Sequence, residues 1–249
     1  MMVSIIIPCY NSQYCIIQAI ESVVQQSYSD WELLVVDDCS SDTSANIIHQ
    51  FMQTDERIRY LKTERPSGSP TIPRNIGIEN AKGRYIAFLD SDDVWLPDKL
   101  EKQLALFKKH EDMAICYTNY EKMSEDGTRN NRVIKAPITI TYEQLLRGNV
   151  IGCLTAVYDT ARVGKVYFQQ HSHEDYILWL SILKQGYIAR NTGTVEALYR
   201  VRKHSVSSNK LKTLLWQWDI YVNVEKLGYL KAAYCFICYA YKAFRKAIT

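Results

Sequence analysis

The chain has 249 residues, of which 47% are hydrophobic and 23% are charged, and its formal net charge at pH 7 is +3. This composition is typical of a soluble globular protein rather than of a disordered or fibrous chain. The length suffices for one large hydrophobic core, or for a domain with an appendage.

The charge is distributed unevenly along the chain. From Arg200 to the carboxyl terminus there are ten Lys and Arg residues but only two Asp and Glu residues, so the remainder of the chain is mildly acidic. A basic segment beside an acidic body favours phosphate-bearing partners, such as a nucleotide diphosphate, lipid headgroups or nucleic acid.

Seven cysteines occur in the chain, mostly within apolar runs. Because their number is odd, we expect reduced core residues of a cytosolic protein rather than a disulfide framework. Cys235 and Cys238 form a CxxC motif, but its apolar, helical surroundings and the lack of a second pair argue against a zinc or redox site. The apolar amino-terminal run has no basic segment before it and is interrupted by Pro8, so we expect no signal peptide and a chain that starts with a core strand.

Predicted strands and helices alternate in the first half of the chain. Short apolar runs predict five strands, over Val3–Ile7, Trp31–Val36, Arg57–Leu61, Tyr85–Leu89 and Ala114–Thr118. Helically spaced apolar residues predict four helices between them, carrying Ile16–Val23, Ile47–Met52, Arg74–Lys82 and Leu100–Phe107. Ser12 is expected to cap the first helix, and the Ser40–Asp42 cluster is expected to start the second.

This alternation predicts right-handed crossovers and a mainly parallel sheet, in which ligands bind at the carboxyl ends of the strands. Acidic clusters at residues 37–42 and 90–93 fall at two such ends. The segment Thr63–Pro73 is rich in Pro, Gly and Ser and is therefore predicted to be a loop.

The second half of the chain is less regular. Four further elements are predicted: a hairpin over 119–136 that turns at Asp126-Gly127, a short helix over Tyr142–Arg147, a buried strand over Asn149–Tyr158 and a helix over Glu174–Gln185.

Two more helices are predicted from Leu211 onward, and the second, Tyr229–Ile248, is rich in aromatic and basic residues. Its uncharged stretch, Ala232–Tyr241, is only half of the roughly 20 residues that span a bilayer. Such a helix is suited to a membrane interface, but packing against the body of the protein or a partner subunit is an equal alternative.

The segment Gly83–Trp95 joins a buried strand to the acids Asp90, Asp92 and Asp93. Three carboxylates so close together repel one another, and a hard cation such as Mg²⁺ or Mn²⁺ relieves this repulsion while leaving coordination positions for substrate phosphates. The alternative is a solvated acidic turn that precedes a helix.

Several nucleotide-binding motifs are excluded. No glycine precedes Gly68, so the first strand is followed neither by a GxGxxG motif nor by a Walker A loop, and the glycine-rich amino-terminal loop of sugar-nucleotide pyrophosphorylases is missing as well. Side chains must therefore hold much of any bound nucleotide. Tyr10, after the first strand, is placed to stack on a base, and Asp37, after the second, could accept the imide N–H of a uracil.

Five blocks of sequence occur in a characteristic order over residues 3–209: PCYN, VVDDCSSD, RNIGIENAKGRYIAFLDSDDVW, HEDYILWL and YRVRKHSVSSN. In this order they strongly resemble the family 2 glycosyltransferases, especially bacterial enzymes that build surface polysaccharides. The resemblance implies a GT-A fold, a Rossmann-like α/β sheet flanked by helices, as a glycosyltransferase domain over 1–209, with a helical carboxyl-terminal extension over 210–249.

The resemblance also implies roles for individual residues. The nucleotide-sugar would be held by Pro8, Tyr10, Asn11, Asp37, Asp38, Arg74, Asp90, Ser91, Arg200, Arg202 and Lys203. Asp92 would bind the Mn²⁺ or Mg²⁺ that bridges the diphosphate. Many relatives carry a histidine where this chain has Arg202, so either His204 reaches the metal or Arg202 and Lys203 clamp the diphosphate.

Asp175, with Glu174 beside it, would be the general base that deprotonates the acceptor hydroxyl. The alternative is that the two acids only complement the dipole of the helix that they begin.

The implied function is that of an inverting, metal-dependent transferase, which moves a hexose-type sugar from a UDP-sugar to a polyprenyl-diphosphate-linked saccharide in O-antigen, capsule or exopolysaccharide biosynthesis. We expect a cytoplasmic protein at the inner face of the cell membrane, with no nucleic-acid partner, and homo-oligomer formation stays open.

One alternative is a catalytically inactive nucleotide-sugar- or membrane-binding module of the same fold. FLDSDDV also matches the nucleophile motif of haloacid dehalogenase-type phosphatases, but that nucleophile follows the first strand of its domain, whereas Asp90 follows about the fourth.

Overall fold

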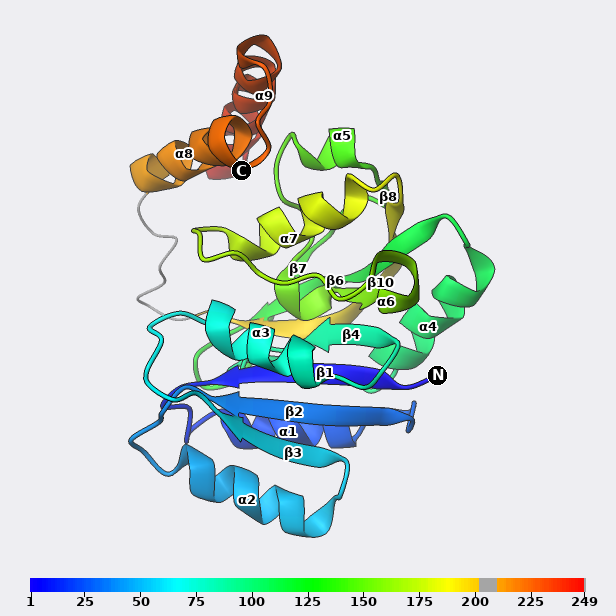
Figure 1. Ribbon diagram of the computed structural model, residues 1–249, viewed down its shortest axis with the longest axis vertical. Helices are drawn as coiled ribbons and strands as arrows, with labels where there is room; N and C mark the ends of the chain where they lie inside the picture. Colours follow the sequence, from blue (N-terminus) through cyan, green and yellow to red (C-terminus); the bar gives the residue numbers. More distant parts are fainter. Residues whose placement is uncertain (202–209, 249) are drawn as a thin grey trace.

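The computed structural model describes residues 1–201 and 210–248. It consists of one sheet covered by helices on both faces (Figure 1). Along the sheet the strands follow the order β3-β2-β1-β4-β9-β6-β10-β5, with β7 paired to β6 and β8 paired to β10. The strands are β1 Val3–Cys9, β2 Trp31–Asp37, β3 Ile58–Lys62, β4 Tyr85–Phe88, β5 Val94–Trp95, β6 Met113–Met123, β7 Arg129–Ile134, β8 Thr139–Ile140, β9 Val157–Asp159 and β10 Ile188–Arg200.

Helices follow most strands. They are α1 Ile16–Val24, α2 Ser44–Thr54, α3 Thr71–Asn80, α4 Lys99–Lys109, α5 Tyr142–Leu145, α6 Thr160–Val163, α7 Glu174–Leu183, α8 Lys210–Asp219 and α9 Tyr229–Ile248, with a 3₁₀ turn over Cys153–Thr155 and a π-helical stretch over Ile220–Val224.

The first four strands form the parallel sheet that the sequence predicts. β1 pairs with both β2 and β4, and β2 pairs with β3, all in parallel. Every residue of β1 and β2 is buried, because helices cover both faces of the sheet. Beyond β4 the sheet is mixed, since β9 runs antiparallel to both β4 and β6.

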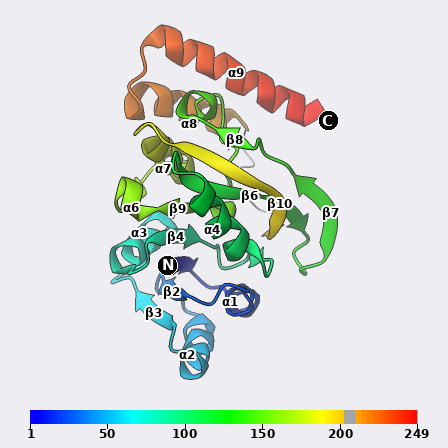
Figure 2. The same cartoon turned by 90° about the vertical axis from the view of Figure 1, so that its right-hand side faces the viewer.

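Two hydrophobic cores lie on the two faces of the sheet. Ile5 and Ile7 of β1 pack in one core with α1, α2 and α4, whereas Ile6 packs in the other core with α3 and α7. Figure 2 shows α1 and α3 on opposite sides of the strands. This alternation follows from the strand geometry, in which successive side chains point to opposite faces.

The carboxyl-terminal helices pack on the same body. Ile220, Tyr221, Ala232 and Cys235 belong to the core that also contains the apolar side chains of α7. The α8–α9 pair lies at the end of the molecule opposite α2 (Figures 1 and 2). The proposed boundary between residues 209 and 210 stays a prediction.

Two local predictions at the first strand are wrong. β1 continues through Pro8 to Cys9, whereas the sequence predicts its end at Ile7. The extension is tolerated because an N–H at position 8 would face the β4 side, where pairing ends at Ile6, while the Cys9 carbonyl accepts from the Asp38 N–H on the β2 side. Ser12 does not cap α1 either: the helix starts after Cys15, and the Ser12 hydroxyl bonds elsewhere.

The segment between α5 and α6 also differs from its prediction. A buried strand is predicted over Asn149–Tyr158, but only Val157–Asp159 is extended, and the 3₁₀ turn precedes it. The apolar run correctly indicates burial, but periodicity alone does not distinguish a buried strand from a compact buried turn. The hairpin prediction is confirmed, since β6 and β7 are antiparallel and Gly127 takes a positive φ of 88° in the turn.

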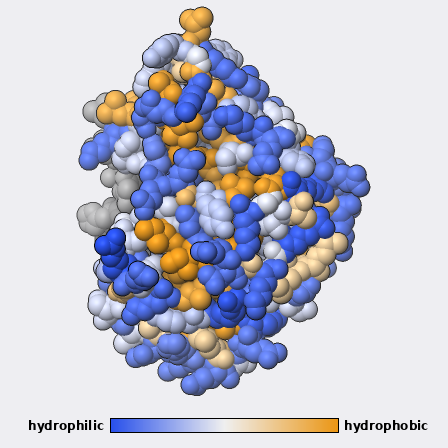
Figure 3. Space-filling view, viewed as in Figure 1, coloured by the Kyte–Doolittle hydropathy of each residue, from blue (hydrophilic) through white to orange (hydrophobic). Residues whose placement is uncertain are grey.

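No disulfide joins any of the seven cysteines, all of which lie in the described part of the chain. None of the helices in residues 1–201 and 210–248 combines the length and the apolar character needed to cross a membrane. On the face shown in Figure 3, hydrophobic surface gathers in the upper half of the molecule, where α7 and the carboxyl-terminal helices lie, and in a second group at the left just below the middle. The region around α2 is largely hydrophilic.

Candidate active site

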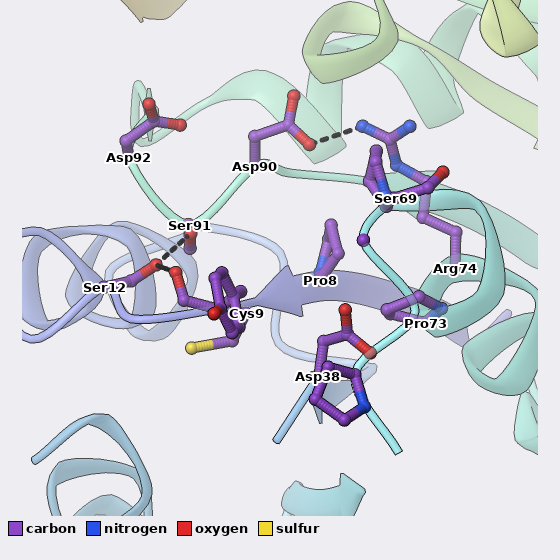
Figure 4. A pocket seen from close by; sticks show the side chains of 14 residues that line it. Pro8, Cys9, Ser12, Asp38, Ser69, Pro73, Arg74, Asp90, Ser91 and Asp92 are labelled. Atoms are coloured by element: carbon purple, nitrogen blue, oxygen red, sulfur yellow. Dashed lines mark hydrogen bonds and ion pairs between the residues drawn. The ribbon is translucent and has the colours of Figure 1, made fainter. Parts of the chain in front are cut away.

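A cavity of about 440 Å³ opens at the carboxyl ends of β1, β2 and β4 (Figure 4). Its walls come from four segments: the end of β1 with the loop after it, Asp38 after β2, the loop before α3 with the first turn of α3, and residues 90–92 after β4. The parallel strands end at one edge of the sheet, so the loops that follow them converge there. This convergence brings together seven of the residues that the sequence predicts for the site: Pro8, Tyr10, Asp38, Arg74, Asp90, Ser91 and Asp92.

The two acids after β2 have different surroundings. Asp37 is fully buried and lies outside the cavity wall, where its carboxylate accepts hydrogen bonds from the Tyr60 hydroxyl (2.7 Å) and the Ser40 N–H (2.9 Å). Asp38 lines the cavity, and its carboxylate accepts bonds from Thr63 and Ser67, which fix the loop before α3. The structure therefore exposes Asp38, rather than Asp37, to the cavity.

The loop after β1 is tied to both of its neighbours. Asn11 takes a positive φ of 45° and its side-chain oxygen accepts from the Ser41 N–H at 2.9 Å, so it braces the loops after β1 and β2 without lining the cavity. The hydroxyls of Ser12 and Ser91 are 2.7 Å apart and join this loop to the acidic loop after β4 (Figure 4). These contacts preorganise the cavity before any ligand binds.

Arg74 links the cavity to the start of α7. Its side chain is only 4% exposed, and it donates from Nη2 to Asp90 at 2.6 Å and from Nη1 to Glu174 at 2.7 Å. Figure 4 shows the guanidinium directed at the Asp90 carboxylate. One buried cation thus holds an acid of the cavity and an acid of α7 in a fixed relation.

Asp175 lies on the other side of this link and outside the cavity wall. Its Oδ2 accepts a hydrogen bond from Asn149 Nδ2 at 3.2 Å. Burial and the neighbouring Glu174 carboxylate raise the pKa of Asp175 to about 6, against the opposing effect of Arg74. A carboxylate with a pKa near the working pH can accept a proton and release it again, as general-base catalysis requires.

The acidic loop after β4 is anchored to the end of β10 through Asp93. Asp93 is 2% exposed and its Oδ1 accepts from the backbone N–H of Arg200 at 2.8 Å. Burial and the carboxylates of Asp90 and Asp92 raise the pKa of Asp93 well above its ordinary value. Asp93 is therefore a structural member of the loop, and Asp90 and Asp92 are the acids on the cavity wall.

Arg200 also lies outside the cavity wall. Its guanidinium donates to the Asp92 carbonyl (2.7 Å), the Glu125 carbonyl (2.8 Å) and the Gln18 side chain (2.6 Å). All three contacts hold protein segments together, so in this structure Arg200 positions the acidic loop instead of facing a diphosphate. The other basic residues expected here, Arg202 and Lys203, lie outside the described residues, as does His204.

The carboxylate oxygens at the cavity wall fit a divalent cation that is also coordinated by a substrate. Asp90 and Asp92 provide carboxylate oxygens at the cavity wall, and Mg²⁺ and Mn²⁺ are commonly held by one or two carboxylates together with phosphate oxygens. Among the residues that the structure describes, no three His, Cys, Asp or Glu side chains form a complete protein cage. Such a site would therefore depend on the substrate for further ligands.

Some wall residues were not singled out from the sequence. These additional wall residues are Cys9, Ser12, Pro66, Gly68, Ser69, Pro70 and Pro73. The Pro, Gly and Ser content of residues 63–73 indicates a loop at the ligand-binding edge, but not which of its residues face inward. Burial raises the pKa of the Cys9 thiol to about 11, so it is a neutral wall group and not a nucleophile.

Comparison with known proteins agrees with this arrangement. The model of the family described as "Glycosyl transferase family 2" matches residues 4–163. TuaG of Bacillus subtilis (strain 168), a glycosyltransferase assigned to teichuronic acid biosynthesis, is 40% identical over 248 residues, which cover 99% of this chain and 98% of TuaG. WfgD of Escherichia coli, named UDP-Glc:alpha-D-GlcNAc-diphosphoundecaprenol beta-1,3-glucosyltransferase, is 43% identical over 220 residues, covering 88% of this chain and 85% of WfgD.

Solved structures share the fold at low sequence identity. Residues 1–349 of Staphylococcus aureus TarS in complex with UDP-GlcNAc superimpose with a TM-score of 0.75 at 20% identity, over 96% of this chain and 72% of that TarS fragment. The Pyrobaculum calidifontis mannosyltransferase PcManGT in complex with GDP-Man and Mn²⁺ superimposes with a TM-score of 0.72 at 16% identity, over 96% of this chain and 69% of PcManGT. With the family match and these relatives, the chain belongs to glycosyl transferase family 2 and has the GT-A fold.

Proposed function

We propose that this glycosyltransferase is an inverting, metal-dependent enzyme that transfers a hexose from a UDP-sugar to a hydroxyl of a lipid-linked saccharide in surface-polysaccharide biosynthesis. The observation that carries the proposal is the chain of contacts from Asp90 through Arg74 to Glu174, next to Asp175. It joins a cavity suited to a nucleotide-sugar to a carboxylate whose pKa is about 6.

The donor would occupy the cavity at the carboxyl edge. Tyr10 is 57% exposed at its wall and offers a ring face to the base. Asp38 and the backbone around Pro8 border the nucleoside, and Asp90, oriented by Arg74, faces the ribose and donor sugar. The name of WfgD includes UDP-Glc and TarS was solved with UDP-GlcNAc, which favours a uridine donor, whereas PcManGT was solved with GDP-Man.

The metal would be held by Asp92, with His204 as a further candidate outside the described residues. A bound Mn²⁺ or Mg²⁺ supplies positive charge that offsets the charge growing on the leaving diphosphate. The Mn²⁺ in the PcManGT complex supports a divalent cation for this fold without identifying the cation of this chain.

Asp175 would take the proton of the acceptor hydroxyl. As the hydroxyl oxygen attacks the anomeric carbon, its O–H bond breaks toward the Asp175 carboxylate and the glycosidic C–O bond breaks toward the diphosphate, which leaves with the electron pair. Attack opposite the leaving group inverts the anomeric configuration. Positioned base catalysis of this kind contributes about 10² to 10⁴ in rate.

The relatives and α9 support the proposed acceptor class and cellular location. The name of WfgD describes an acceptor in which GlcNAc is joined to undecaprenol through a diphosphate. Helix α9 exposes Leu230 (90%), Ile237 (67%) and Tyr241 (62%), and it carries basic residues nearby, a combination suited to the headgroup region of a membrane. We therefore place the enzyme at the cytoplasmic face of the membrane, where such an acceptor would be presented.

A donor and metal panel tests the proposal. The metal-stripped protein is assayed with UDP-glucose, UDP-GlcNAc, UDP-galactose and GDP-mannose, with and without Mn²⁺ or Mg²⁺, on lipid-linked α-D-GlcNAc diphosphate. We expect metal-dependent transfer from one UDP-sugar and a β-linked product by NMR. An α-linked product from an α-linked donor would contradict inversion, and donor binding without transfer on any acceptor would favour an inactive module.

A further inference from the structure

A second cavity, of about 560 Å³, lies beside α7 and apart from the donor cavity. Its walls come from the β6–β7 hairpin, the loop 147–152 after α5, the start of α7, one residue of α8 and the second half of α9. None of the residues that line it also lines the donor cavity. The carboxyl-terminal helices thus complete a binding space that the amino-terminal half does not form by itself.

This second cavity borders the proposed base. Asn149 lines its wall and donates a hydrogen bond to Asp175, while His173 and Tyr176, which also line it, flank the two acids in sequence. On the other side, Glu174 is bonded to Arg74, which lines the donor cavity. The two acids therefore lie between two cavities, as a transfer reaction between a donor and an acceptor requires.

The charged residues that line the second cavity are all basic. Lys135, Arg147 and Lys242 line it, and none of its lining residues is acidic. Within residues 1–201 and 210–248 these three cations form no ion pair with a carboxylate, although Arg147 lies 5.6 Å from the ring centroid of Tyr234. Clustered cations without counter-charges favour a polyanion, and a diphosphate matches this requirement.

Polar and aromatic groups in the same wall suit a sugar. Gln217 is only 2% exposed, and neither its Nε2 nor the Nε2 of His173 has a hydrogen-bond partner among the described residues. A buried unpaired polar atom is unfavourable unless a ligand or water bonds it. Tyr120, Tyr176 and Tyr239 add aromatic surface of the kind that packs against sugar rings.

A third cavity continues from the second along α9. It has a volume of about 390 Å³ and shares Arg147 and Lys242 with the second cavity. Cys238 and Tyr241 add apolar surface beyond them, and Arg245 completes its wall. From Asp175 outward, a polar sugar-sized space is therefore followed by the shared cations Arg147 and Lys242 and then by a wall that combines apolar surface with Arg245. A saccharide joined through a diphosphate to a hydrocarbon chain has the same order of chemical groups.

We propose that the second cavity binds the head of a lipid-linked acceptor, with the sugar beside Asn149 and Asp175 and the diphosphate between Lys135, Arg147 and Lys242. This inference rests on the proposed function, because it assigns the acceptor to a site next to the proposed base. It adds a diphosphate-recognition site built by the loop after α5 and by α9.

The test is direct binding of a defined probe in the absence of donor and metal. The probe is α-D-GlcNAc diphosphate carrying a short alkyl chain, compared with inorganic diphosphate and with the alkyl glycoside that lacks phosphate. The variant is the double substitution Arg147→Gln and Lys242→Gln. The matched control is Lys108→Gln with Lys109→Gln, which removes the same charge from exposed positions at the end of α4.

We expect the Arg147/Lys242 variant to bind the diphosphate probe roughly 10-fold to 100-fold more weakly than the wild type, as loss of one or two charge-assisted hydrogen bonds predicts. The variant should keep wild-type affinity for UDP and for the phosphate-free glycoside, and it should keep the wild-type melting temperature. The control should match the wild type in every one of these measurements. The wild type should also bind the alkyl probe more tightly than inorganic diphosphate.

Three results would overturn the inference. The first is no binding of the probe by the wild type, and the second is equal binding of the probe by the wild type and the variant. The third is equal affinity of the wild type for the alkyl probe and for inorganic diphosphate, which would indicate a free-anion site. Because the measurement needs no turnover, failure of the acceptor site can be distinguished from failure of the proposed function. Loss of probe binding in the variant would support the site even if no sugar were transferred, and wild-type transfer with unchanged probe binding would refute the site alone.

Discussion

Arg74 and Asn149 hold the two acids at the start of α7 in different electrostatic states. Glu174 accepts from Arg74, a buried cation, so its charge is matched. Within the part of the chain that the structure describes, the Asp175 carboxylate accepts hydrogen bonds from the neutral Asn149 amide and the adjacent Tyr176 N–H, and its pKa is raised to about 6. Two neighbouring carboxylates with different environments can have different roles, one as a fixed charge and one as a proton acceptor.

The pH dependence of transfer follows from this difference. Since the ionised form of Asp175 is the proposed base, kcat/KM should fall about tenfold for each pH unit below 6 and level off above it. Asn149 donates to the carboxylate and so lowers the pKa of Asp175; removing the amide in Asn149→Ala should shift the acid limb to higher pH. The measurement is kcat/KM from pH 5 to 9, and an acid limb that stays in place in Asn149→Ala would contradict this role.

At the scale of elements, the site depends on loops that fold against one another at one edge of the sheet. The Ser12–Ser91 contact joins the loops after β1 and β4, and the Asp38–Ser67 contacts fix the loop before α3. Arg200, at the end of β10, joins the acidic loop to the β6–β7 turn. A residue of the second half of the chain thereby positions acids contributed by the first half.

Replacing Arg200 tests whether it supports the loop or binds the diphosphate. Lysine has one ammonium group and cannot replace the three guanidinium contacts, so Arg200→Lys should raise the metal concentration for half-maximal activity by about 10–100-fold, as other supporting contacts of metal sites do. Binding of UDP in the presence of EDTA should stay unchanged. Weaker metal-free binding of UDP would instead indicate a diphosphate contact, and Arg129→Lys on the same hairpin serves as the control.

Elements buried on both faces were predictable because their sequences are continuous apolar runs. β1 and β2 are examples, with every residue buried. β10 was not predicted: Asn191 and Gly193 interrupt its apolar pattern, and its register against β6 shifts nearby. Its position depends on pairing with β6 in the folded sheet, which no local pattern encodes.

The candidate site was predictable in its location but not in every contact. Asp90 and Asp92 follow a buried strand, so the sequence places them at the ligand-binding edge, and the cavity includes both. Which of Asp37 and Asp38 faces that cavity depends on where the strand ends, because successive side chains point to opposite sides. The contacts of Asn149 and Arg200 join segments distant in sequence, so only the fold reveals them.

At the scale of the whole molecule, the donor cavity and the second cavity lie on either side of the acids of α7, and the carboxyl-terminal helices wall the second cavity. The same helices carry the exposed apolar surface of α9. The proposed acceptor site and the proposed membrane contact are therefore parts of one end of the molecule, opposite α2 (Figure 1).

Vesicle binding tests the membrane contact. The double substitution Ile237→Asp and Tyr241→Asp places two carboxylates on the exposed surface of α9 and should reduce co-sedimentation with anionic vesicles by at least about tenfold, because two partly buried apolar groups are lost from the interface. The matched control is Ile138→Asp with Tyr167→Asp, two exposed apolar residues outside α9, which should bind as the wild type does. Equal binding by both double variants would exclude α9 as the contact.

The most direct test of the account is the rate of transfer by Asp175→Asn, measured together with its binding of UDP-sugar and metal. The amide keeps the size of the side chain and its place beside Asn149, but it cannot accept the proton. We predict that kcat falls by about 10² to 10⁴ while donor and metal affinities stay at wild-type values. Transfer at the wild-type rate, or a loss of activity explained fully by weaker donor binding, would contradict the assignment of Asp175 as the base.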